Sequence, residues 1–216
     1  MPPSSGARPR RQRPAFTACT CVAYRATSYD VPLWVSPNRR SGRWNIAGKT
    51  PTQYLALDAE APFAEVLRRE DLRTEEDASH YSSTIWQMQI EEAMVVDYSS
   101  FALAEQAGFD PAALVDDDFE RCQAEATRLS DEGARGILSP SAALPGSINL
   151  TLFGPRVGVG WATTAKLASA IPVQRVATGH PPPGLTSRVR YFGRAHPLLR
   201  SFGETSKQQN PPGPAD

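Results

Sequence analysis

Five polar residues stand in stretches of the sequence that are otherwise apolar or suited to turns. They are two arginines, a tyrosine, a glutamate and a serine: Arg25, Arg43, Tyr54, Glu65 and Ser141. A guanidinium group matches phosphate oxygens in two-point geometry, and a carboxylate stabilises positive charge that develops nearby. Each residue also has an ordinary explanation, as an exposed strand arginine, a loop arginine, a core tyrosine, a solvent-facing glutamate or a turn serine. Taken singly, none of them establishes a site.

The neighbours of these residues explain why they stand out. Arg25 interrupts an apolar run rich in β-formers, where a charged side chain needs a reason. Arg43 follows a glycine, so that its backbone can approach a ligand closely. Glu65 has apolar neighbours on both sides within a predicted helix, and Ser141 follows a proline just beyond a predicted strand.

Other residues that are capable of chemistry form weaker patterns. Glycines 154, 158 and 160 loosely resemble a dinucleotide fingerprint, but threonine stands at the third glycine position, so a plain turn is favoured. The three histidines lie in polar or proline-rich surroundings without a nucleophile motif. Cys19 and Cys21 are too close together and too isolated for a zinc site, and we expect no bound metal.

Hydrophobic periodicity predicts a mixture of strands and helices without a regular βαβ alternation, which indicates an α+β fold. The predicted strands cover residues 20–27, 53–57, 83–90, 135–139, 148–153, 171–177 and 187–192. The predicted helices cover residues 58–70, with Asp58 as N-cap, 116–131 and 163–170. In the second helix, an apolar stripe of Phe119, Cys122, Ala126 and Leu129 makes Cys122 a core thiol rather than a nucleophile.

The bulk composition suits one globular domain. The 216 residues are 40% hydrophobic, and we expect a domain over residues 17–202 between a disordered basic arm (1–16) and a disordered polar tail (203–216). The net charge of zero gives no long-range attraction to nucleic acid or to an anionic membrane. The three cysteines form no disulfide framework, and no apolar run approaches the ~20 residues that cross a bilayer, so we expect a cytoplasmic protein.

Arginine supplies 20 of the 23 basic residues. A GC-rich coding bias accounts for this simply, because alanine, proline and glycine are also plentiful. Phosphate recognition is the alternative explanation. Only the roles of particular arginines can decide between coding bias and phosphate recognition.

Taken together, the five polar residues occur in an order that resembles the RES domain. The resemblance is carried by Tyr24-Arg25, Gly42-Arg43-Trp44-Asn45, Tyr54-Leu55-Ala56, Ala64-Glu65, the Pro140-Ser141 turn and the strand from Asn149 to Phe153. Tyr54 lies 11 residues after Arg43, and Glu65 lies 11 residues after Tyr54. The resemblance covers about residues 20–178, most of the predicted domain.

This resemblance implies a single domain similar to the ADP-ribosyltransferase fold, with mixed central sheets and flanking helices. It also implies a bacterial toxin that degrades NAD⁺, by hydrolysis or by phosphorolysis to ADP-ribose 1-phosphate. NAD⁺ is then a substrate, inorganic phosphate is a possible co-substrate, and no cofactor is permanently bound. The implied partner is an Xre-like antitoxin that covers the active site; direct nucleic-acid binding is not expected.

By the same resemblance, Arg25, Glu65 and Ser141 are catalytic residues, and Arg43 and Tyr54 bind NAD⁺ or phosphate. Glu65 would stabilise the positive charge on the ribose as nicotinamide leaves. Ser139 competes with Ser141 as the family serine, because the two lie two residues apart. The division of labour between the two arginines is open, as is phosphorolysis against hydrolysis. Two rival functions also stay open: an ADP-ribosyltransferase that modifies a macromolecule, and an inactive binding module.

Overall fold

The two longest strands form the centre of the fold. In a computed structural model that describes residues 14–161 and 169–209, β1 (Phe16–Thr27) pairs antiparallel with β3 (Ser83–Asp97) along nearly its whole length. Trp86, Met88 and Ile90 on β3 are buried, as the alternation of their segment predicts. Both strands are longer than predicted, because residues 16–19 of β1 and 91–96 of β3 extend the same antiparallel pairing.

The sheet closes on itself. Strands β2 (Thr52–Ala56), β5 (Ile148–Phe153) and β4 (Gly136–Pro140) complete the order β1-β2-β5-β4-β3, and β3 returns to β1. Strands β7 (Ala170–Gly179) and β6 (Val157–Gly160) extend the sheet from the first half of β3. Neighbouring strands are antiparallel except for the pairs β3–β4 and β6–β7. The predicted α+β class is confirmed, but the described residues form one mixed sheet rather than several.

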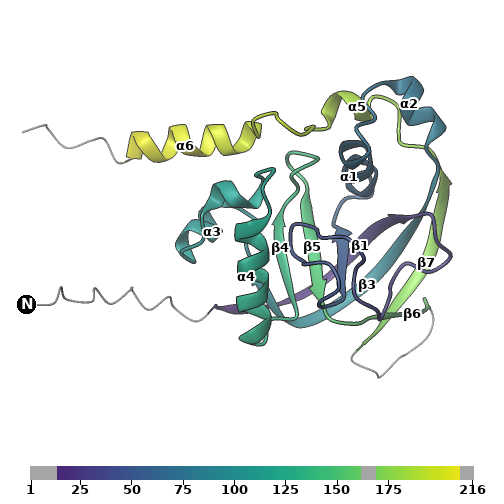
Figure 1. Cartoon of the computed structure of the whole chain (residues 1–216), viewed down its shortest axis with the longest axis horizontal. Helices are drawn as coiled ribbons and strands as arrows, with labels where there is room; N and C mark the ends of the chain where they lie inside the picture. Colours follow the sequence, from purple (N-terminus) through teal and green to yellow (C-terminus); the bar gives the residue numbers. More distant parts are fainter. Residues whose placement is uncertain (1–13, 162–168, 210–216) are drawn as a thin grey trace, which may run out of the picture.

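Short helices surround this sheet. Helices α3 (Phe101–Gln106) and α4 (Glu120–Asp131) lie on the β4 side, whereas α1 (Ala61–Arg69), α2 (Glu75–His80) and α5 (Leu185–Arg188) gather at one end of the sheet (Figure 1). The 3₁₀ turn η1 (Pro111–Leu114) precedes α4, and α6 (Pro197–Gln209) follows α5. The first turn of α1 contains Pro62, and the Asp58 side chain accepts from the Glu60 backbone N–H (2.9 Å) instead of capping the helix itself.

The apolar stripe of α4 is confirmed except at its first residue. Cys122, Ala126 and Leu129 are buried, and the Cys122 thiol donates to the Ala113 carbonyl. Phe119 precedes the helix and is only half-buried, because the chain enters α4 at Glu120 rather than at residue 116. Its ring instead lies under the guanidinium group of Arg43, 4.8 Å away.

The strand predicted over residues 187–192 is wrong. The chain forms α5 and then an irregular segment, because Leu185 and Val189 are buried at the four-residue spacing of a helix. The other predicted strands are confirmed with shifts of a few residues. Most of the helix predicted over residues 163–170 lies outside the described residues, and Ala170 begins β7.

Two elements extend past the expected ends of the domain. Phe16 belongs to β1 and pairs with Val96, and α6 crosses the expected domain end at residue 202. Residues 1–13 of the predicted arm and 210–216 of the predicted tail lie outside the described part of the chain. Within the described part, no helix is long and apolar enough to cross a membrane.

Candidate active site

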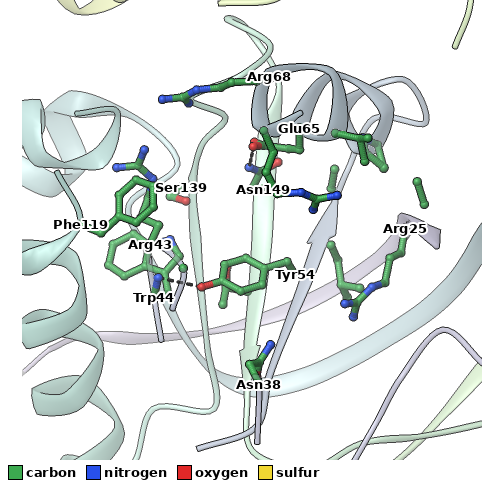
Figure 2. Close-up of a pocket in the computed structure, with 18 of the residues that line it drawn as sticks. Arg25, Asn38, Arg43, Trp44, Tyr54, Glu65, Arg68, Phe119, Ser139 and Asn149 are labelled. Carbon is green, nitrogen blue, oxygen red and sulfur yellow. Dashed lines mark hydrogen bonds between the residues drawn. The ribbon is translucent and has the colours of Figure 1, made fainter. Parts of the chain in front are cut away.

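A cavity of about 420 Å³ opens between α1, the strands β1, β2 and β5, and the loop before β2. Four of the five predicted site residues line it: Arg25, Arg43, Tyr54 and Glu65. Figure 2 shows Glu65 projecting from α1 near Asn149, with Tyr54 across the cavity and the two arginines on opposite sides. A cavity of this size falls within the range of small-molecule sites.

Glu65 is held by one of its carboxylate oxygens. Its Oε1 accepts hydrogen bonds from the Ser141 hydroxyl (2.9 Å) and from the Asn149 side-chain amide (2.8 Å). Within the described residues no hydrogen bond reaches Oε2. The carboxylate is therefore fixed in position while one oxygen stays free for a ligand.

Ser141 is fully buried and does not line the cavity. Besides its bond to Glu65, its Oγ accepts from the backbone N–H groups of Ala143 (3.2 Å) and Leu144 (3.0 Å). Ser139, the competing serine, lines the cavity instead. Ser141 thus positions the carboxylate, whereas Ser139, although buried, borders the cavity directly.

Arg25 is a buried cation. Its Nη1 donates to the Gln53 side-chain carbonyl (3.3 Å), and its guanidinium group lies 3.7 Å from the ring centroid of Trp34. No carboxylate in the described residues forms an ion pair with it. Burial lowers the pKa of Arg25, since it disfavours the charged form. An anionic ligand would supply the missing counter-charge.

Gln53 organises this corner of the cavity. Its side chain is fully buried, accepts from the Trp34 backbone N–H (3.4 Å) and donates to the Trp34 carbonyl (2.8 Å). The Gln53 amide thus forms the same two hydrogen bonds with the Trp34 backbone that a neighbouring strand would form. It holds both the Trp34 indole and the Arg25 guanidinium group in place.

Arg43 is anchored on the opposite side. Its Nη1 and Nη2 donate to the main-chain carbonyls of Ala113 (3.0 Å) and Asp116 (2.7 Å), and it also lacks a carboxylate partner among the described residues. These two bonds leave three of the five guanidinium N–H donors for a ligand. The group is thus oriented by the protein without being neutralised by it.

Tyr54 fixes the backbone beside Arg43. Its hydroxyl donates to Asn45 Oδ1 and accepts from the Trp44 N–H, both at 2.8 Å. A Cβ at Gly42 would lie 2.7 Å from this hydroxyl, so only glycine permits the arrangement. Burial raises the pKa of Tyr54, which keeps the phenol neutral.

Several residues that line the cavity are not among the predicted site residues, and three of them are informative. Asn149 bonds Glu65; Arg68 lies one turn after Glu65 on α1, where i,i+3 spacing could have indicated it; and Phe192 comes from a segment predicted as a strand. Arg68 forms an ion pair with Asp117 (2.6 Å). Four arginines line the cavity: Arg25, Arg43, Arg68 and Arg69. Glu65 is the one carboxylate among the described residues that line it. The arginines therefore suit an anionic ligand, and the carboxylate suits a ligand atom on which positive charge develops.

The histidines and cysteines lie outside this constellation. Neither residue type lines the cavity, and the described residues contain no cluster of three or more His, Cys, Asp or Glu that could hold a metal ion. His196 is buried behind Ser141, with Nε2 3.3 Å from the Ser141 carbonyl oxygen.

The chain is similar to known proteins in sequence and in fold. The RES domain matches residues 21–168, which contain all five predicted site residues. No curated protein matches the chain. Among solved structures, the fold is similar to the crystal structure of the M. tuberculosis MbcT–MbcA toxin–antitoxin complex, with a TM-score of 0.56 and 22% identity over 81% of this chain and 91% of that chain. Because the match covers more than half of the sequence, this chain belongs to the RES domain family.

Proposed function

We propose that this protein is an NAD⁺-degrading toxin that cleaves the bond between nicotinamide and ribose. One observation carries the proposal: a single carboxylate, Glu65, is fixed through Oε1 in a cavity that also presents two arginines without carboxylate partners. Membership in the RES domain family supports the same conclusion.

The chemistry requires a fixed negative charge beside the ribose. As the neutral nicotinamide leaves, positive oxocarbenium character develops at the ribose, and the carboxylate stabilises this transition state more than the ground state. At an effective dielectric near 20, unit charges about 4 Å apart interact by roughly 4 kcal/mol. Because Ser141 and Asn149 already orient Glu65, little reorganisation is needed when the charge appears.

The arginines serve the anionic part of the reaction. Arg25 and Arg43 would bind the diphosphate of NAD⁺ or orient inorganic phosphate. In phosphorolysis, a phosphate oxygen bonds to the ribose carbon as the bond to nicotinamide breaks, and the products are nicotinamide and ADP-ribose 1-phosphate. In hydrolysis, water takes that place, and the products are nicotinamide, ADP-ribose and a proton. Tyr54, as a neutral phenol, would pack against the ribose or nicotinamide.

The biological setting is part of the proposal. The solved structure with a similar fold is a toxin–antitoxin complex, which supports a protein antitoxin as the partner of this chain. We further propose that the antitoxin is Xre-like and covers the cavity, that the enzyme acts in the cytoplasm, and that its fold is related to ADP-ribosyltransferases.

Product analysis tests the proposal. Purified protein, free of antitoxin, is incubated with NAD⁺ with and without inorganic phosphate, and the products are identified. ADP-ribose 1-phosphate formed only with phosphate indicates a phosphorylase, and free ADP-ribose under both conditions indicates a hydrolase. Intact NAD⁺ under both conditions, or labelled ADP-ribose attached to a macromolecule, would contradict the proposal.

A further inference from the structure

An exposed aromatic ring on the C-terminal segment lies at the cavity. Phe192 lines the cavity with 42% of its surface exposed, more than any other aromatic residue there. It lies beyond residues 21–168, so the RES domain match does not include it. The ring therefore offers an apolar, aromatic face on the cavity wall, as small-molecule sites commonly do.

The segment that carries this ring is firmly attached. The Asp117 carboxylate accepts from the Gly193 N–H (2.6 Å) and also pairs with Arg190 (3.0 Å) and Arg68 (2.6 Å). Gly193 has a φ of +79°, which other residues rarely adopt, and this turn aims its N–H at Asp117. Phe192 is thus a fixed part of the wall.

The surroundings of the ring suit a planar group, because the ring and the guanidinium group beside it are both flat. The Arg68 guanidinium group lies 4.3 Å from the ring centroid of Phe192 and is held by its ion pair with Asp117, which Arg190 shares. Arg43, without a carboxylate partner among the described residues, is a cation on this side that can bind phosphate. Figure 2 shows Arg68 extending from α1 away from Glu65, on the side where Arg43 and Phe119 lie.

We propose that Phe192 is the stacking surface for the adenine ring of NAD⁺ and that it gives the enzyme its preference for the dinucleotide. This inference rests on the proposed function, because that function supplies the ligand. From Glu65 outward, the cavity would then bind the reacting ribose, the diphosphate at Arg43 and the adenine at Phe192. A nucleobase stacks on an aromatic side chain through its π-face, which a branched aliphatic side chain cannot replace.

Binding measurements test this assignment separately from turnover. In a Glu65→Gln background, which keeps the ligand intact, NAD⁺ and nicotinamide mononucleotide are titrated by calorimetry against otherwise unchanged protein, Phe192→Leu and Phe192→Tyr. Phe192→Leu preserves apolar packing against Arg68 but removes the flat ring. We expect it to weaken NAD⁺ binding about tenfold and to leave the mononucleotide, which lacks adenine, unchanged. Phe192→Tyr should retain the affinity for NAD⁺.

Leu198→Ala is the matched control, because Leu198 is 47% exposed on the same C-terminal segment and does not line the cavity. It should bind both ligands normally. Unchanged NAD⁺ binding in Phe192→Leu would overturn the inference, and so would an equal loss for both ligands, since that indicates a general disturbance of the wall. If the wild-type protein leaves NAD⁺ intact, the proposed function fails, while these titrations still decide whether Phe192 recognises adenine.

Discussion

At the scale of single residues, the site consists of one oriented charge and the groups that orient it. Ser141 and Asn149 reach Glu65 across 76 and 84 residues of sequence, and both bond the same oxygen. Arg25 and Arg43 are held by an amide and by main-chain carbonyls, which fix direction without cancelling charge. The predictions for single residues therefore test the charge of a side chain separately from its orientation.

Glu65→Gln removes the charge and keeps the shape. The amide oxygen of glutamine can still accept from Ser141 and Asn149, so the melting temperature should change by no more than about 2 °C. Release of nicotinamide from NAD⁺ should fall at least about 100-fold, the scale on which losing one transition-state contact acts. Turnover close to that of the wild type would defeat the role assigned to Glu65.

Ser141→Ala and Ser139→Ala should behave differently. Removing the Ser141 hydroxyl leaves the buried N–H groups of Ala143 and Leu144 without their acceptor, so chemical denaturation should show a loss of about 2–3 kcal/mol. Activity should fall as well, because Glu65 loses a donor. Ser139 lines the cavity, so its replacement should change KM or kcat with little loss of stability. Equal destabilisation by both substitutions would show that Ser141 has no special structural role.

Arg43→Lys tests the geometry of the guanidinium fork. Lysine keeps the charge but cannot bond the carbonyls of Ala113 and Asp116 and still present donors in a fixed plane. We expect kcat/KM for NAD⁺ to fall about tenfold or more in steady-state assays. Wild-type kinetics would identify Arg43 as an ordinary loop residue.

At the scale of elements, Asp117 links three parts of the chain that form the cavity wall. It lies before α4, it pairs with Arg68 on α1, and it holds the segment after α5 through Arg190 and Gly193. The pKa of Asp117 is lowered by the Gly193 N–H and by Arg190 and Arg68, which together outweigh the opposing effect of its burial. The arginine side chains are nearly buried, so neither can replace this partner with water.

Asp117→Asn should loosen this junction. Two nearly buried guanidinium groups would lose their counter-charge, which costs about 3 kcal/mol in unfolding experiments. Because Phe192 would lose its support, NAD⁺ affinity should fall in parallel. As a control, Asp71→Asn removes a carboxylate whose ion pair with Arg73 is exposed, and it should change stability by less than about 0.5 kcal/mol. Similar effects of the two substitutions would contradict a linking role for Asp117.

At the scale of the whole molecule, the closed sheet brings distant segments around one cavity, and the C-terminal segment then packs against it. His196 is the buried contact at this junction: it meets the Ser141 carbonyl, and its ring lies edge-on to Phe101 at 5.7 Å. Burial lowers the pKa of His196, and Arg190, Arg68 and Arg43 lower it further, whereas the Ser141 carbonyl opposes them. Stability should therefore depend on pH through this residue.

The direction of that dependence follows from linkage. The folded protein holds His196 neutral, whereas the unfolded chain takes up a proton near its ordinary pKa of about 6.5, so acid favours unfolding. Between pH 7.5 and 5.5, the wild type should lose more stability than His196→Gln, as measured by urea denaturation at each pH. A pH dependence that is the same in both proteins would show that His196 does not contribute.

Much of the fold could be predicted from local patterns. The alternation in β3 and the apolar stripe of α4 follow from periodicity, and β2, β4 and β5 correspond to short runs between turn-forming residues. The segment after Gly184 was misjudged, because its buried Leu185, Val189 and Tyr191 fit a strand nearly as well as a helical turn followed by an irregular stretch. Closure of the sheet was not predictable, because the contact of β1 with both β2 and β3 depends on pairing between distant segments.

For the site, the sequence by itself determined the family and four residues that do line the cavity: Arg25, Arg43, Tyr54 and Glu65. Each is a polar residue in a stretch of sequence that is otherwise apolar or suited to a turn. Such an exception can be seen without a structure. Tertiary structure alone decided that Ser141 supports Glu65 from behind while Ser139 faces the cavity, and that Phe192 completes the wall. The physical reason is that side-chain direction and burial depend on contacts across scores of residues, which periodicity along the chain does not encode.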